Sequence, residues 1–425
     1  MKRSSKLTSL FLALTLSLTA GNNRAGAGMP EVRIAVVSDI HVMAPELLEK
    51  EGKAFDSYVS RDRKMLKESS SILKELTRQL LEAKPQLVLI SGDLTKDGEY
   101  SSHHYLVENC LNTLNTAGIR TLVVPGNHDV NNPNAFSFNG DTQQQVKTIT
   151  PKEFAECYAD YGYGKSIARD KYSLSYVSEP FENLRILAID ACEYEDNDFK
   201  NNKCITGGRI KPETMDFIRK QVADAKIKGI QIFAMMHHGL VQHWKGQEDM
   251  MKDYLIDDWS SHADAFAETG LNVVFTGHFH AQDIVKHEFG NAFVYDIETG
   301  STLTYPCPYR LISMKNENIS IETRNISAID YDLKGATFQD YAKKYLVDGL
   351  TNVATQMLPG EIPDTIKSAI SGILATTMIA HSSGDEFLCL EEKNNSLKRK
   401  VLHKSKPSSG ITSEPISNPR VFFTL

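Results

Sequence analysis

Beyond its first residues, the sequence has few cysteines, no long apolar run and no excess of positive charge. The formal net charge is -7 at pH 7, so no global basic field indicates nucleic acid or an anionic membrane as a default partner. Six cysteines are too few to be the main framework of a fold of 425 residues. Since 41% of the residues are apolar, the chain is predicted to be globular with an ordinary buried core.

The N-terminus contains the one apolar run that suggests targeting. Three basic residues precede a run from Leu7 to about Ala20, and small residues follow it. This order is typical of a secretory signal peptide, and the run is shorter than the ~20 apolar residues of a spanning helix. We therefore predict cleavage after about residue 27, no stable membrane span afterwards, and export to the periplasm or the extracellular space. Export permits disulfides, and Cys192 and Cys204, which flank a polar loop, are either bridged or free thiols.

Six short apolar runs, each ending in polar residues, predict strands. Runs of this length that are rich in Val, Ile and Leu are typical of strands buried on both faces. Helical patterns lie between them, one ending near Pro85 and one ahead of Gly118. The alternation predicts an α/β fold with largely parallel central strands. The runs are residues 33–41, 86–93, 120–129, 184–190, 231–238 and 271–280.

The chain divides into three predicted segments. A signal peptide spans residues 1–27, an α/β domain spans 28–327, and a C-terminal helical region with a tail spans 328–425. Residues 131–180 form a long polar excursion inside the main domain, which is typical of a functional loop or cap. The C-terminal helices are predicted to serve packing or self-association into a homo-oligomer, because no polar strand end lies beyond Gly300.

Polar side chains collect where the predicted strands end. The carboxyl ends of strands form the ligand-binding edge of open α/β sheets, so these residues are expected to converge. Oxygen and imidazole ligands without thiolate suit Mn, Fe, Zn or Co. The set is too large for one four-coordinate ion and predicts two divalent ions ~3.5–4 Å apart. The residues are Asp39, His41, Asp93, Asn127, His128, Asp129, His237, His238, His278 and His280.

Five further histidines are assigned structural roles, because a lone histidine near a strand end is more often structural than a ligand. This group comprises His103, His104, His243, His262 and His287.

Five short motifs in a fixed order carry a family resemblance. "SDIH", "SGD", "PGNHD", "MMHH" and "TGHFH", within residues 34 to about 300, resemble the calcineurin-like metallophosphoesterase superfamily. The resemblance implies a four-layer αββα sandwich with two mixed sheets, here followed by the helical extension. It also implies the ligands: Asp39, His41 and His280 for the first metal, Asn127, His237 and His278 for the second, and Asp93 as the bridge. Gly239 stands where the family has proline, so His238 remains an alternative to His237.

The resemblance also implies an activity. A hydroxide between two metals would attack the phosphorus of a small phosphate ester. His128, oriented by Asp129, would lie beside the metals and contact the phosphoryl oxygen or protonate the leaving group. The motifs look most like those of the family's cyclic-nucleotide and glycerophosphodiester enzymes, which favours a phosphodiesterase. The alternatives are an exported phosphomonoesterase and a non-catalytic scaffold of the same fold, and the complete set of ligands argues against the scaffold.

Overall fold

The computed structural model describes residues 30–60, 62–315, 318–359, 361–384 and 420–424. The expected signal peptide and most of the expected C-terminal tail lie outside these residues. Among the described helices, none combines the length and the apolar character needed to cross a membrane.

One mixed sheet has six strands in the order β16-β15-β14-β1-β3-β4. β1, β3 and β4 pair in parallel, whereas β14, β15 and β16 extend the sheet antiparallel from the other side of β1. The strands are β1 (Val32–Val37), β3 (Leu87–Ser91), β4 (Arg120–Val124), β14 (Pro308–Lys315), β15 (Asn318–Asn325) and β16 (Arg420–Thr424).

A second mixed sheet has seven strands in the order β12-β13-β11-β10-β9-β8-β7. Its central strands β9, β10, β11 and β13 are parallel, and the outer pairings are antiparallel. The strands are β7 (Ala168–Arg169), β8 (Tyr176–Phe181), β9 (Leu184–Ile189), β10 (Gln231–Met236), β11 (Val273–Thr276), β12 (Asp283–Phe289) and β13 (Ala292–Glu298). The six runs predicted as strands are therefore confirmed as β1, β3, β4, β9, β10 and β11.

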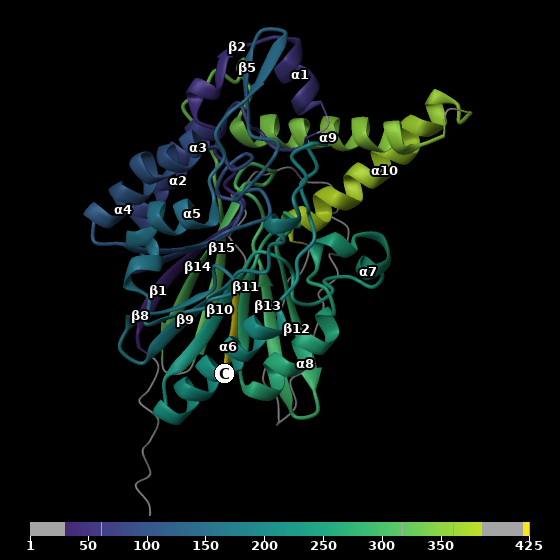
Figure 1. Ribbon diagram of the computed structural model, residues 1–425. Coiled ribbons are helices and arrows are strands. Elements are labelled where there is room, and N and C mark those ends of the chain that lie inside the picture. Colours follow the sequence, from purple (N-terminus) through teal and green to yellow (C-terminus); the bar gives the residue numbers. More distant parts are fainter. Residues whose placement is uncertain (1–29, 61, 316–317, 360, 385–419, 425) are drawn as a thin grey trace, which may run out of the picture.

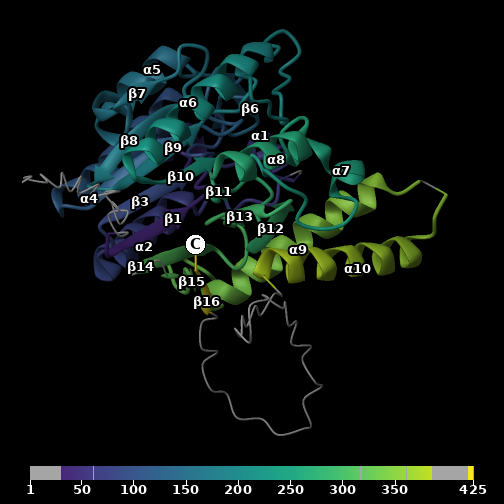
Figure 2. The ribbon, with the colours of Figure 1, turned by 90° about the horizontal axis from the view of Figure 1, so that it is seen from below.

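The two sheets face each other, and helices cover their outer sides (Figures 1 and 2). β10 shows why its run is apolar throughout. Phe233 and Met235 lie in the core that also contains β1 and β3, whereas Ile232, Ala234 and Met236 pack in the second core with α6 and α8. Because successive side chains of a strand point to opposite faces, both faces of this sheet are buried. The predicted four-layer sandwich is confirmed.

The covering helices carry the predicted apolar faces. α2 ends where Lys84 takes a left-handed conformation before Pro85, which ends the helix as expected. The pattern ahead of Gly118 forms α3 and α4, joined by one π-helical turn at Val107–Leu111. The α-helices of the main domain are α1 (Lys53–Val59), α2 (Ser69–Ala83), α3 (Tyr100–Leu106), α4 (Asn112–Thr116), α5 (Pro151–Cys157), α6 (Pro212–Lys228), α7 (Gln247–Met250) and α8 (Trp259–Thr269).

The excursion at residues 131–180 is folded onto the main body. A small sheet of β2 (Leu48–Lys50), β5 (Phe136–Asn139) and β6 (Thr142–Gln145) forms at one end of it. Phe154 and Tyr158 are fully buried in the main core. Short 3-10 turns complete the chain at Pro45–Leu47, Ala159–Tyr161, Tyr163–Lys165, Tyr194–Asp196 and Lys252–Tyr254.

The C-terminal region forms a helical hairpin of α9 (Phe338–Met357) and α10 (Asp364–Ser383), which extends beyond the sandwich (Figure 1). Phe338 and Ala342 belong to the main core, so the first turns of α9 are part of the body of the protein. β16 was not expected from the sequence, which suggested only helices and a polar tail. It pairs with β15, whose unpaired backbone groups would otherwise form the edge of the sheet.

The cysteines that the structure describes are all free thiols. The alternative of a Cys192–Cys204 bridge is therefore not realised. The Cys192 sulfur lies 3.5 Å from the carbonyl oxygen of Pro125, and the Cys204 sulfur lies 3.3 Å from that of Asn127. The two thiols pack against the backbone of the same loop without joining.

Candidate metal centre

The polar strand ends converge from both sheets. Residues after β1, β3 and β4 come from the first sheet, and residues after β10 and β11 come from the second. Their side chains make three groups in which the ligand atoms lie within 4.8 Å of one another. The groups are Asp39, His41 and His280; Asp93, His237 and His278; and His41, Asp93 and His128. The convergence predicted from the sheet edge is thus observed.

The first group surrounds a buried carboxylate oxygen. Asp39 Oδ1 lies 3.2 Å from His280 Nε2 and 3.7 Å from His41 Nε2, and the two imidazole nitrogens are 3.3 Å apart. Within the described part of the chain, this oxygen has no hydrogen-bond donor. A buried carboxylate oxygen facing two imidazole nitrogens is an arrangement that a divalent cation satisfies.

The second group is organised around Asp93. Its Oδ2 lies 3.2 Å from His237 Nε2 and 3.5 Å from His41 Nε2, so one oxygen faces both metal groups. Asn127 Oδ1 is 3.1 Å from His237 Nε2 and joins the second group. Asp93 Oδ2 therefore lies between the two ligand groups.

Backbone carbonyls fix the two histidines of the second group. His237 Nδ1 donates to the carbonyl oxygen of Ser91 at 2.9 Å, which leaves Nε2 for a metal. His278 Nε2 donates to that of Asp253 at 3.1 Å, which leaves Nδ1. His238 instead donates from Nε2 to the carbonyl oxygen of Thr206 and belongs to none of the three groups. The geometry thus favours His237 over His238 as the ligand.

Most of the candidate ligands have an unusual backbone conformation. A positive φ is uncommon in residues other than glycine and costs of order 1–3 kcal/mol where the backbone is strained. Such conformations persist where the surrounding structure enforces them, and they collect at functional sites. The residues are Asp39 (φ 51°), His41 (41°), Asp93 (49°), His278 (73°) and His280 (63°).

Two motif glycines permit the close packing of these loops. A Cβ on Gly126 would overlap Asp93 Oδ1, and a Cβ on Gly277 would overlap the Ser38 hydroxyl and Asp39 Oδ2. Glycine in "PGNHD" and in "TGHFH" is therefore required by the approach of one ligand loop to another.

Electrostatics prepare the site for cations. Burial disfavours charged carboxylates, but neighbouring histidines, His280 for Asp39 and His237 for Asp93, hold both pKa values well below the usual range. At His237, burial would lower the pKa, but this effect is outweighed, chiefly by Asp93, and the pKa rises to about 9. At His41, burial has the larger effect and lowers the pKa to about 3. The low pKa values of Asp39 and Asp93 keep both carboxylates in the ionised form that binds cations.

His128 lies beside the metal groups with its ring oriented by Asp97. Its Nδ1 is 2.9 Å from Asp97 Oδ1 and 2.8 Å from the carbonyl oxygen of Lys96, so Nδ1 carries a proton and Nε2 is free. The side chain is 25% exposed, whereas that of His41 is fully buried. The His128 side chain is therefore partly open to solvent.

The expectation that Asp129 orients His128 was wrong. Asp129 is fully buried and accepts hydrogen bonds from the backbone N–H groups of Gly126, Leu94 and Thr95. The turn in which Asp129 N donates to the Gly126 carbonyl directs the carboxylate back under the loop. Asp129 therefore joins the loops after β3 and β4 and does not contact the imidazole.

No motif in the sequence indicated Asp97 or its partners. The second oxygen of Asp97 contacts Lys96 Nζ at 2.7 Å and the Tyr58 hydroxyl. Lys96 is fully buried and also pairs with Glu99 at 2.8 Å. Burial would raise the pKa of Asp97, but Lys96 and then His128 hold it below its usual value. The only hint was the short distance in sequence from Asp93.

The histidines assigned structural roles lie outside the three ligand groups. His103 is buried between the Tyr158 hydroxyl and the carbonyl oxygen of Asp129. His243 is buried against Asp283, Asp296 and Glu298.

Thr304 supports the first metal group from behind and provides a test of it. Its hydroxyl is 3.2 Å from His280 Nδ1, the nitrogen that faces away from Asp39. Loss of such a partner typically weakens metal binding 10–100-fold, so Thr304→Val is expected to lower the metal affinity of the first ligand group by roughly this factor. Competition with a chelator measures the affinity. Thr302→Val is the matched control, because the buried Thr302 hydroxyl has no partner in the described chain. Equal affinities in the two variants would contradict the support role.

The protein is therefore an α/β protein with two stacked mixed sheets. Its candidate metal site is formed by Asp, Asn and His side chains at the carboxyl ends of strands from both sheets. The chain belongs to the calcineurin-like phosphoesterase family, whose sequence model matches residues 32–282.

The solved structures found as similar have low sequence identity to this protein. A dimetal phosphatase from Danio rerio is 12% identical over 70% of this chain and 97% of its own, with a TM-score of 0.49. GAP50 of Plasmodium, described as the anchor in the inner membrane complex, is 10% identical over 73% and 89%, with a TM-score of 0.37. A Streptococcus pneumoniae protein described as a predicted phosphoesterase is 14% identical over 73% and 97%, with a TM-score of 0.26. A search of curated protein sequences found no match.

Proposed function

We propose that the protein is an exported phosphodiesterase that depends on two divalent metal ions. The observation that carries the proposal is Asp93 Oδ2, which faces the histidines of both metal groups at 3.2 and 3.5 Å. A single bridging carboxylate between two sets of Asp, Asn and His ligands suits a pair of Mn, Fe, Zn or Co ions. When bound, such ions supply positive charge for the phosphate and an activated water for attack on phosphorus.

The protein's own groups complete the chemistry. Asp39, His41 and His280 would hold the first ion, Asn127, His237 and His278 the second, and Asp93 would bridge them. As an imidazolium, His128 would donate Nδ1–H to Asp97 and present Nε2–H toward the substrate side, where it would donate to a phosphoryl oxygen or transfer its proton to the leaving alkoxide and become neutral. Burial of the ligand side chains keeps bulk water away and strengthens these electrostatic interactions.

The motif pattern supports a diester as the substrate, as argued from the sequence. An exported phosphomonoesterase is the second candidate, because the same ligands serve monoesters. A non-catalytic scaffold is disfavoured because the predicted Asp and His ligands fall into the three ligand groups and Asn127 Oδ1 lies 3.1 Å from His237 Nε2.

A panel of phosphate esters tests the proposal. Purified protein reconstituted with Mn²⁺ is expected to bind two ions per chain and to hydrolyse bis(p-nitrophenyl) phosphate faster than p-nitrophenyl phosphate. Protein treated with a chelator provides the matched inactive control, and added metal restores activity. Preference for the monoester would overturn the diester assignment, and the absence of metal-dependent hydrolysis of every ester would overturn the proposed function.

N-terminal sequencing of the secreted protein is expected to find a first residue near position 28.

A further inference from the structure

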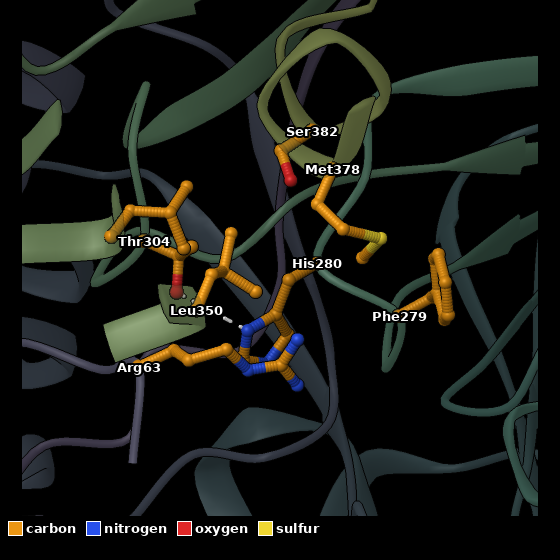
Figure 3. A pocket seen from close by; sticks show the side chains of 8 residues that line it. Arg63, Phe279, His280, Thr304, Leu350, Met378 and Ser382 are labelled. Atoms are coloured by element: carbon orange, nitrogen blue, oxygen red, sulfur yellow. Dashed lines mark hydrogen bonds between the residues drawn. The ribbon is translucent and has the colours of Figure 1, made fainter. Parts of the chain in front are cut away.

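A small cavity beside the metal ligand His280 is partly walled by the C-terminal hairpin (Figure 3). His280 and Thr304 form one side, and Leu346 and Leu350 of α9 with Met378 of α10 form another. Its volume of about 10 Å³ is that of one water-sized group. The hairpin was expected only to pack or to self-associate, but it also lies at the rim of the first metal group.

Arg63 also lines this cavity, and its side chain extends toward the His280 ring (Figure 3). It belongs to the short segment between α1 and α2, which crosses the rim of the site. Since His280 is a candidate ligand of the first metal, the Arg63 side chain lines a cavity next to the candidate metal centre.

The backbone around Arg63 is fixed from three directions. Asp62 Oδ1 accepts from the backbone N–H groups of Arg63 and Lys64 at 2.7 and 3.0 Å. Met65 N donates to the carbonyl oxygen of Leu303, the residue before Thr304. Gly349 of α9 packs directly on the segment, because a Cβ there would be 3.6 Å from Arg63 Cγ. The position of Arg63 is thus set before any ligand binds.

The charge of Arg63 lacks a partner. Its guanidinium makes no hydrogen bond or ion pair with any residue that the structure describes, whereas the neighbouring cations are paired. Lys64 Nζ lies 3.5 Å from Asp62, and Lys96 Nζ lies 2.7 Å from Asp97. A half-buried cation beside a site for two metal ions is electrostatically unfavourable unless an anion lies between them.

We propose that Arg63 is an anion-binding residue of this site and that its guanidinium binds the non-bridging oxygens of the phosphate group being hydrolysed. The planar fork of arginine matches two phosphate oxygens, and the Arg63 side chain lines the same cavity as His280 of the first metal group and Leu346 and Leu350 of the hairpin. The inference rests on the proposed function, since it assigns Arg63 to the substrate of the same site. It also gives α9 and α10 a role in substrate binding.

Binding of inorganic phosphate to the full-length, Mn²⁺-loaded protein tests the proposal. Arg63→Met is expected to weaken phosphate binding, measured by calorimetry, by roughly 10–100-fold, the range for a lost hydrogen bond to a charged group. KM for bis(p-nitrophenyl) phosphate should rise by a similar factor, and two metals per chain should remain. Arg63→Lys, which keeps the charge but loses the fork, should lie between the variant and the original protein.

Arg219→Met is the matched control, because Arg219 is exposed on α6 and pairs only with Asp216 in the described chain. It is expected to bind phosphate like the original protein. Unchanged phosphate affinity in Arg63→Met with both metals bound would overturn the proposal, and so would loss of a metal, which would make Arg63 a support of His280. If Arg63→Met does not fold, unchanged affinity in Arg63→Lys overturns it.

The two proposals fail in different ways. If no ester is hydrolysed but phosphate binding still depends on Arg63, the proposed function is wrong and the anion site stands. If esters are hydrolysed with the same KM by all variants, the proposed function stands and the assignment of Arg63 is wrong.

Discussion

Asp93→Asn is expected to purify with fewer than two metal ions per chain and to hydrolyse phosphate esters more than about 100-fold more slowly than the original protein. This loss is larger than the loss expected when a residue that only hydrogen-bonds to a metal ligand is replaced. Asp93 Oδ2 faces His237 and His41, so one substitution affects both metal groups. Asparagine is chosen because it tolerates the left-handed conformation of this residue (φ 49°) better than alanine does.

Metal analysis and thermal unfolding with and without Mn²⁺ measure the effect. A metal that binds only the folded state raises the unfolding temperature, and this rise should shrink in Asp93→Asn. Asp190→Asn is the matched control. Asp190 follows β9 at a similar strand end, but its carboxylate accepts from Leu174 N, Cys192 N and the Tyr194 hydroxyl and belongs to none of the ligand groups. Full metal content and normal rates in Asp93→Asn would refute the bridging role.

The α/β fold and the convergence of polar strand ends were predictable because both depend on simple periodic features, whereas the four-layer sandwich and the division of the ligands between two metals were implied by the family resemblance. A strand buried on both faces must be apolar throughout, so the end of the strand can be recognised where polar residues begin. This happens at Ser91, the last residue of β3, and directly after Met236, the last residue of β10. Parallel strands place those ends at one edge, which brings Asp39, Asp93 and His237 together without knowledge of any loop.

The error at Asp129 shows what adjacency in sequence does not determine. Neighbouring residues point in directions that the turn decides, and the tight turn from Gly126 sends Asp129 under the loop while His128 faces the site. The true partner, Asp97, comes from the loop after β3. Its contact depends on how the loops after β3 and β4 pack against each other, which no local pattern encodes.

The C-terminal region shows the same limit at larger scale. Periodicity predicted the helices α9 and α10, but the surface that they cover depends on single close contacts such as Gly349 against Arg63. β16 was missed because a short strand is stabilised by its partner, here β15, which lies far away in sequence.

His128→Ala is expected to retain both metal ions and to slow turnover by about 10²–10⁴-fold, the range for a general acid. The loss should be smaller for substrates with a nitrophenolate leaving group, which hardly needs a proton, than for alkyl esters. The reason is geometric, since Asp97 and the Lys96 carbonyl hold Nδ1 and leave Nε2 free in a side chain that is 25% exposed. Metal content and rates with both kinds of leaving group measure these effects.

Two variants of neighbouring carboxylates serve as matched controls for the role of His128. Asp97→Asn should show the same dependence on the leaving group to a lesser degree, because an amide orients the imidazole without stabilising its charged form. Asp129→Asn should show no such dependence, because its carboxylate contacts the backbone of Gly126, Leu94 and Thr95 and not the imidazole. A missing metal in His128→Ala would make His128 a ligand together with His41 and Asp93, whose atoms it can join in one group. Full metal content with unchanged rates in His128→Ala would show that His128 takes no part in turnover. The same leaving-group dependence in Asp129→Asn would support the first prediction, in which Asp129 orients His128.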